Sequence, residues 1–430
     1  MSATDSTAAV EAAYRFEFPR VVAVLTSYVK GDIGLAEELA QESLVDALRQ
    51  WPRDGIPQNP GAWLTAVGKR KAIDHFRRSR TLDAKYADLG REVEQAAPLS
   101  VEQEAATSTP EQIDDDRLRL IFVSCHPVLP VRARVALTLR LIGGLTVPEI
   151  ARAYLVPEAT IAQRIVRAKK SIAQAGVPFE VPEGADRTAR LDAVLEAIYL
   201  IYNEGYSATA GEEWLRPELC HEALRLGRVL AALMPDEAEV HGLVALMEFQ
   251  SSRLVARTDA EGSPILLLDQ DRRLWDRLLI NRGEAALGRA EALRPEPGPY
   301  TLQAAIAGCH ARAFSADETD WAKVATLYDE LAQSSPSPVV ELNRAVAISR
   351  ANGPDAALPI VDALIEHGAL DRYHLLYSVR GDLLERMERH DEAATEFERA
   401  AVLATNLQER DLCLERARTN RTRTTKGRAG

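Results

Sequence analysis

The sequence is poor in cysteine and has no long run of apolar residues. Four cysteines occur in 430 residues: Cys125, Cys220, Cys309 and Cys413. They lie far apart, without the paired spacing of a zinc site. No stretch approaches the roughly 18 apolar residues that span a bilayer, and the first residues lack the basic leader and apolar core of a secretory signal. We therefore expect a cytoplasmic protein with reduced thiols, no cofactor, no metal and no membrane partner.

Strand-forming residues are also scarce relative to helix formers. Valine and isoleucine are outnumbered by alanine, leucine, glutamate and arginine, which favour helices. Amphipathic stretches alternate with short segments rich in proline and glycine. An all-α fold is predicted, and the length of 430 residues predicts two to four domains.

The net charge of -12 is unusual for a protein that binds a polyanion, but the charge is unevenly divided. Residues 1–175 hold 23 basic and 22 acidic side chains, whereas residues 176–430 hold 29 and 42. Within the first part, Lys69–Arg80 carries six basic residues and one acid, and Arg164–Lys170 carries four and none. Such local clusters, rather than the net charge, attract a polyanion within a Debye length.

The clearest local motif is Leu145–Ile172, LTVPEIARAYLVPEATIAQRIVRAKKSI. Thr146 followed by Glu149 is a capping box that predicts the start of a short helix. A second helix is predicted to start at Pro157 and Glu158 after three or four residues. This spacing is typical of a helix-turn-helix.

The second helix has two distinct faces. Ile161, Ile165, Ala168 and Ile172 repeat at helical spacing and predict a buried stripe. The other face carries side chains that can donate hydrogen bonds to phosphates and base edges: Thr160, Gln163, Arg164, Arg167 and Ser171. The alternative interpretation is a helical hairpin with a solvated basic face.

Two further helices are predicted before this motif. Residues 34–51, GLAEELAQESLVDALRQW, place leucines on one side and acids on another. After a Pro/Gly/Asn segment, a second helix runs from Gly61 to Arg80 and ends in the basic cluster. Cations there can hold phosphate oxygens, and Trp63, Phe76 and Tyr86 can stack on unpaired bases. A basic helix end that only favours the helix dipole is the alternative.

Taken in order, residues 34–51, 60–78 and the helix-turn-helix resemble regions 2 and 4 of an extracytoplasmic-function sigma factor. The resemblance implies region 2 at residues 8–80, a flexible linker at 81–113 and region 4 at 114–176. The remaining residues, 185–418, would form a helical extension, and the basic tail after it is expected to be unstructured. Core RNA polymerase and promoter DNA are the implied partners.

The resemblance also implies roles for individual residues. Residues on the first helix would bind the clamp of RNA polymerase: Glu38, Gln41, Glu42 and Asp46. The segment 51–60 and the next helix would hold the opened minus-ten element: Trp63, Lys69, Arg70, Lys71, His75, Arg77 and Arg78. The recognition helix would contact the minus-35 element: Thr160, Gln163, Arg164, Arg167, Lys169 and Lys170. An ordinary solvated acidic stripe is the alternative for the first set.

The second half of the chain contains a repeat. Ala356, Ile360 and Ala363 recur 37 residues later, and Gly381 precedes Ala393 and Phe397 as in the tetratricopeptide pattern. We expect such units at about 320–406, stacked into a surface that binds a protein partner. Three other stretches resemble the extension of a sigma subgroup but suggest no residue-level role: residues 203–212, 269–276 and 298–311.

Three other functions were weighed against a polymerase-binding initiation factor. A one-component regulator with a helical sensor domain would share the helix-turn-helix but has no need of residues 34–80. A scaffold of repeats would lack salt-dependent affinity for DNA. An enzyme would need a site, and Asp269 with Asp271 or the adjacent Cys–His pairs are poor candidates, because adjacent ligands rarely close a tetrahedral metal site.

Overall fold

A computed structural model describes residues 17–79, 110–154, 156–207, 214–259, 262–368 and 370–429. The described residues are mostly helical, and β-type pairing among them is confined to isolated bridge residues, such as Thr258 and Pro264. This confirms the predicted all-α class. The chain divides into two compact units, Met1–Leu200 and Ile201–Gly430, which are described separately below.

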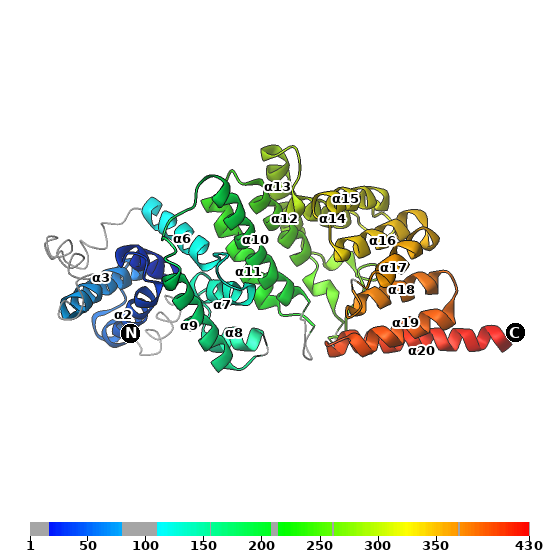
Figure 1. Ribbon diagram of the computed structural model, residues 1–430, viewed down its shortest axis with the longest axis horizontal. Helices are drawn as coiled ribbons and strands as arrows, with labels where there is room; N and C mark the ends of the chain where they lie inside the picture. Colours follow the sequence, from blue (N-terminus) through cyan, green and yellow to red (C-terminus); the bar gives the residue numbers. More distant parts are fainter. Residues whose placement is uncertain are drawn as a thin grey trace. The chain divides into compact units, whose positions relative to one another are not determined.

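The first unit begins with a module of three helices, namely residues 17–28, α2 (Ile33–Asp54) and α3 (Pro60–Ser79) (Figure 1). Asp32 caps α2 by accepting a hydrogen bond from the Leu35 amide at 3.0 Å, and Asn59 caps α3 in the same way. Large apolar side chains fill the space between these helices: Phe18, Leu39, Trp51, Leu64 and Phe76. The module lies where region 2 is predicted.

The second module of this unit contains α6 (Pro110–Ser124), α7 (Val131–Leu141), α8 (Val147–Ala153) and α9 (Glu158–Gln174). Helix α9 packs against α7 and α8 through the predicted apolar stripe, whose four members are buried. Helix α6 starts at Pro110, within the segment predicted as a linker. The rest of that prediction, together with Tyr86, lies outside the described residues.

The second unit begins within α10 (Gly184–Tyr206) and continues with α11 (Pro217–Leu233) and α12 (Ala238–Ser251). Two short 3-10 helices, η1 (Leu254–Arg257) and η2 (Arg272–Leu274), then precede α13 (Arg277–Leu293) and α14 (Pro299–Arg312). Helix α12 packs against α11, α13 and α14. It is therefore the central helix of this part, and most of its side chains are buried.

From α15 onward, consecutive helices pack against each other. Their bounds are α15 (Trp321–Ser334), α16 (Pro338–Asn352), α17 (Pro354–Glu366), α18 (His374–Arg386), α19 (His390–Leu403) and α20 (Leu407–Ala429). The predicted glycine and aromatic positions meet here: a Cβ atom on Gly381 would lie 2.9 Å from the ring of Phe397. The lack of a side chain at Gly381 therefore lets α18 and α19 approach closely, as in a tetratricopeptide-like unit.

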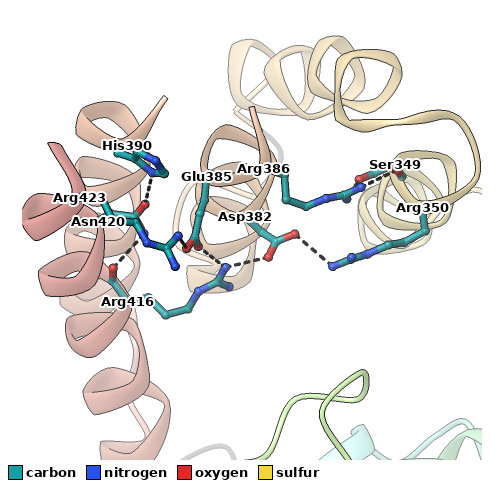
Figure 2. A network of polar contacts seen from close by, with 9 residues as sticks. All are labelled: Ser349, Arg350, Asp382, Glu385, Arg386, His390, Arg416, Asn420 and Arg423. Carbon is teal, nitrogen blue, oxygen red and sulfur yellow. Dashed lines mark hydrogen bonds and ion pairs between the residues drawn. The ribbon is translucent and has the colours of Figure 1, made fainter. Parts of the chain in front are cut away.

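The prediction of an unstructured basic tail is wrong, because α20 continues to Ala429. Arg416 bridges Asp382 at 2.8 Å and Glu385 at 2.6 Å, and Arg423 pairs with Glu385 at 3.0 Å. Figure 2 shows how these ion pairs join α20 to α18, and how Asp382 also reaches Arg350 of α16. Arg416 and Arg423 of α20 thus have carboxylate partners on α18.

All four cysteines have free thiols and are buried. Burial raises the pKa of Cys125 to about 11, that of Cys220 to about 12 and that of Cys413 to about 11. Burial also raises the pKa of Cys309. None of the helices that the structure describes combines the length and apolar character needed to cross a membrane.

Candidate nucleic-acid interface

The predicted capping box positions the two helices of the helix-turn-helix. The Thr146 hydroxyl accepts a hydrogen bond from the Glu149 amide at 3.3 Å, and the Glu149 carboxylate accepts one from the Thr146 amide at 2.7 Å. These reciprocal bonds satisfy donors that the start of a helix leaves unpaired. Helix α8 ends at Ala153, and α9 begins at Glu158 after a short turn. This confirms the predicted geometry.

Helix α9 presents a polar and cationic face opposite its buried stripe. Thr160, Gln163, Arg167 and Lys170 are exposed, and Arg164 is half-buried. Among the described contacts, none of these five side chains forms an ion pair. Their donors are therefore available to the oxygen atoms of a phosphate or the edge of a base.

Lys169 differs from the rest of the predicted set. Its ammonium group forms an ion pair with Glu37 of α2, and Arg140 of α7 donates to the same carboxylate at 2.7 Å. Burial alone would raise the pKa of Glu37, which is 4% exposed, but the charges of Lys169 and Arg140 outweigh it and hold the pKa below 4.5. The triad therefore fastens the first module to the second.

Glu37 and Arg140 were missed by the sequence analysis. A signal was present: Glu37 lies four residues after Ile33 and three before Ala40, both of which are buried. A carboxylate at this spacing is buried with them and requires a cationic partner. The sequence did not indicate which cation that partner is.

The predicted basic residues of α3 differ in their exposure and in their contacts. Arg70, His75, Arg77 and Arg78 are exposed, whereas Lys69 lies 5.8 Å from the centre of the Tyr28 ring. Arg77 also lies 4.0 Å from the carboxylate of Asp74 in an exposed pair. Exposed pairs of this kind contribute little free energy, so breaking this one costs little.

Lys71 connects two of the predicted sets. Its ammonium nitrogen lies 2.9 Å from Asp46 and 3.3 Å from Glu42, two of the residues predicted to contact polymerase. Burial acts to lower the pKa of Lys71, but the hydrogen bonds and charges of Asp46 and Glu42 raise it overall. Lys71 thus holds α3 against α2 and partly neutralises the acidic face of α2.

The other two residues of the acidic set behave differently. Glu38 and Gln41 are exposed, and Gln41 donates a hydrogen bond to Glu37 at 3.0 Å. Glu38 forms no ion pair among the described residues. Among the acids predicted to bind polymerase, Glu38 is therefore the one without a cationic partner in the described part of the chain, since Glu42 and Asp46 contact Lys71.

A pair of tryptophans connects the end of α2 to the start of α3. The rings of Trp51 and Trp63 meet edge to face, with centroids 5.6 Å apart and an interplanar angle of 67°. Trp51 is buried, whereas Trp63 is half-buried and presents part of its ring to solvent. Trp63 therefore packs against Trp51 and remains partly accessible close to the 55–59 loop.

Asp271, one of the acids that the sequence offers as a metal ligand, is engaged by Arg273 instead. Asp271 accepts a hydrogen bond from the Arg273 amide at 3.0 Å and pairs with the guanidinium of Arg273, which holds the pKa of Asp271 at about 2. No group of three potential metal ligands occurs within the described part of the chain.

Comparison with known protein families gives three matches along the chain. The model of sigma-70 region 2 matches residues 14–81, and that of sigma-70 region 4 matches residues 119–172. A family of unknown function, DUF6596, matches residues 190–291. The two sigma models cover the helices that carry the candidate interface.

Two individual proteins are similar over most of the chain. An uncharacterised protein of Rhizobium meliloti (strain 1021) is 46% identical over 397 residues, which cover 91% of each chain. The crystal structure of yeast Tom70 covers 98% of this chain and 85% of its own, with 12% identity and a TM-score of 0.37.

Proposed function

The chain belongs to the extracytoplasmic-function type of sigma-70 factors with a C-terminal extension, a family whose members direct RNA polymerase to promoters, and we propose that α9 recognises the minus-35 element while α3 holds the opened minus-ten element. The observation that carries this proposal is the presence of both modules in one chain. A one-component regulator needs only the second module.

The minus-35 contacts are assigned to the exposed face of α9. Arg167 and Lys170 hold phosphates, and Thr160, Gln163 and Arg164 reach base edges. The proposal rests on the exposure of these side chains and on the usual placement of a recognition helix in the major groove. Lys169 contributes to DNA binding only when its pair with Glu37 opens.

The minus-ten contacts are assigned to α3 and the loop before it. Arg70, His75, Arg77 and Arg78 lie on the exposed surface, where cations attract the backbone of a single strand. Trp63 provides a ring on which an unpaired base stacks. Lys69 and Lys71 complete the basic surface when the pairs of Lys71 with Glu42 and Asp46 are exchanged.

Polymerase binding is assigned to the acidic face of α2, with Glu38 as the main contact and with Gln41, Glu42 and Asp46 beside it. The chemistry of transcription belongs to polymerase, so this chain acts by binding and without a cofactor. A cytoplasmic location follows from the same partner.

Transcription from a promoter library with purified core polymerase tests the function. Wild-type protein is expected to join polymerase in a pull-down and to produce discrete run-off transcripts. Glu38→Lys is expected to weaken the pull-down at least tenfold, whereas Glu180→Lys, an exposed charge reversal outside α2, leaves it unchanged. Failure of the wild-type protein to join polymerase would overturn the proposal.

We assign the acidic extension a regulatory or docking role, acting on polymerase or through a protein partner of the repeats. Its excess of 42 acidic over 29 basic residues would compete with DNA for the basic clusters. Removal of the chain after Leu200 tests this, because a cut at residue 176 would also remove Glu196, which pairs with Arg134 at 3.0 Å. Unchanged promoter affinity and salt dependence would exclude the competition.

A further inference from the structure

The three stretches of the extension to which the sequence assigned no role come together in the second unit. Tyr206 belongs to the first stretch, Arg272 to the second and His310 to the third. Arg253 and Arg257, in and beside η1, contact the same region. We call Arg253, Arg257 and Arg272 the arginine cluster.

Arg257 is enclosed by aromatic rings. Its guanidinium carbon lies 3.5 Å from the centre of the Tyr206 ring and 4.3 Å from the centre of the Trp214 ring. The residue is 5% exposed, and one nitrogen donates to the Tyr206 carbonyl oxygen. The Tyr206 ring is itself held by stacking on Tyr202 at 5.7 Å. This arrangement fixes a positive charge inside the unit.

Arg253 lies beside the same ring, with its guanidinium carbon 5.4 Å from the centre of Tyr206. It is half-buried and so forms the accessible edge of the cluster. Burial is the main cause that lowers the pKa of Arg257, Arg272 and His310, and the positive charge of Arg253 lowers each of these pKa values further. Arg253 therefore lies within electrostatic reach of all three groups.

Arg272 is fixed by neutral acceptors alone. It is 5% exposed and donates to the carbonyl oxygens of His310 at 2.8 Å and Ala313 at 3.0 Å, and to the Thr319 hydroxyl at 3.0 Å. Its Nε donor is buried and has no hydrogen-bond partner. The nearby His310 is uncharged at neutral pH, because burial and the charges of Arg253 and Arg272 lower its pKa to about 3.

The cluster has no counter-charge among the described residues. Glu318 acts on Arg272 only through its field, and Glu409 accepts a hydrogen bond from Trp214 instead. By contrast, Arg216, another buried arginine among the described residues of this unit, pairs with the carboxylate of Glu204. Guanidinium groups cannot lose their protons, so an unpaired buried cluster is costly unless an anion compensates it.

Three buried donors without hydrogen-bond partners belong to the cluster or to rings that contact it. They are the Tyr206 hydroxyl, the Arg272 Nε and the indole nitrogen of Trp275, whose ring lies 5.0 Å from the Arg272 guanidinium carbon. Buried donors are almost always satisfied in folded proteins. Cations and unsatisfied donors together are complementary to an oxyanion, which accepts several hydrogen bonds and carries negative charge.

We propose that the arginine cluster, with Tyr206, is a binding site for a phosphate-type oxyanion, either the free ion or the phosphate end of a small metabolite. The three positive charges of the cluster are better balanced by a phosphate dianion than by a single carboxylate ligand. Arg253 receives the anion at the accessible edge, and Arg257 and Arg272 supply charge from behind. The site is independent of the assignments made for the DNA-binding half.

Binding to nucleic-acid-free, full-length protein tests this site. Calorimetric titration with inorganic phosphate is compared among the wild type, Arg253→Gln and Arg273→Gln. Arg273→Gln removes an exposed positive charge, paired with Asp271, from a residue next to the cluster. The loss of one charge-assisted contact, worth about 1.5–3 kcal/mol, weakens binding about tenfold or more, so only Arg253→Gln should lose affinity.

Three further measurements complete the test. Phosphate should raise the melting temperature above that in chloride of equal ionic strength for the wild type and Arg273→Gln. Tyr206→Phe, which removes only an unpartnered hydroxyl, should weaken phosphate binding even if Arg253→Gln folds poorly. Tighter binding of a nucleoside triphosphate would identify a nucleotide as the source of the phosphate, and equal affinity would identify the free ion.

The proposal is overturned if phosphate stabilises the wild type no more than chloride does. It is equally overturned if Arg253→Gln and Tyr206→Phe both bind phosphate as the wild type does. Preferential binding of glutamate over phosphate would show a carboxylate site instead and contradict the assigned ligand class.

Discussion

Glu37 of α2 and Lys169 of α9 form an ion pair across 132 residues of sequence. The two helices belong to the modules that match regions 2 and 4, respectively. Because Arg140 shares the same carboxylate at 2.7 Å, a single acidic side chain of one module neutralises two cations of the other. One of those cations lies on α9, the helix proposed to recognise the minus-35 element.

Replacement of Glu37 by glutamine is expected to destabilise the first unit strongly. It would leave Arg140 and Lys169 without a counter-charge in a buried position, and removal of one partner from a buried pair costs about 3–5 kcal/mol. Urea unfolding measures the loss. The matched change Glu38→Gln, at the exposed neighbouring position, should remain within about 0.5 kcal/mol of the wild type.

The same carboxylate predicts a pH dependence. The pKa of Glu37 in the folded protein lies below its usual value of 4.5, so its stabilising contribution is present above that value. The contribution is lost as the pH falls through the lowered pKa. The difference in unfolding free energy between wild type and Glu37→Gln should therefore shrink with acidification. A difference that stays constant over this range would show that Glu37 does not titrate as the triad requires.

Arg167 and Lys169 should differ in their contribution to DNA binding. Arg167 is exposed and without an ion pair among the described residues, whereas Lys169 is engaged by Glu37. Arg167→Ala should reduce the slope of log affinity against log salt by about 0.9, the value for one phosphate contact. Lys169→Ala should change it less. Equal effects in a fluorescence-anisotropy titration would contradict the assignment of Lys169 to an internal pair.

Loss of the capping box should weaken the helix-turn-helix. Thr146→Ala removes the hydroxyl that accepts from the Glu149 amide, at a cost of about 1 kcal/mol for an N-cap. Thermal unfolding of the variant should show this loss. Thr160→Ala provides the contrast: its exposed side chain should matter for DNA binding and leave stability nearly unchanged.

Gly381 is expected to tolerate no added side chain. A Cβ atom would lie 2.9 Å from the buried Phe397 ring, and overpacking of this kind costs about 1–3 kcal/mol. Gly288→Ala in α13 is the control, because its Cβ would meet nothing within 4 Å and alanine favours a helix by about 1 kcal/mol. In urea denaturation, the free energy of unfolding should therefore fall for the Gly381→Ala variant and rise for Gly288→Ala.

Short-range patterns allowed much of the fold to be predicted. The capping box of α8 and the apolar stripe of α9 depend on residues three or four positions apart, and the structure confirms both. The triad of Glu37 could not be predicted in the same way, because its partner Arg140 lies 103 residues away. The sequence indicates that Glu37 lies on the buried side of its helix, but it does not identify the cation that pairs with it.

The same limit explains two other outcomes. The tail after Arg418 has the composition of an unstructured segment, yet Arg423 finds Glu385 at 3.0 Å and the helix continues. The arginine cluster lies in and beside η1 and η2, and the groups around it come from the end of α10 and from α14. Each segment contributes one or two residues, so no single stretch carries a recognisable signature. Roles assigned to individual DNA and polymerase contacts stay predictions.

The four buried cysteines are expected to react slowly with reagents in solution. A thiol attacks alkylating reagents and peroxides only as its thiolate, and burial raises the pKa of Cys220 to about 12. Modification must therefore wait for local opening of the helices around each sulfur atom. Pulse labelling of these thiols is expected to report how often each part of the fold opens.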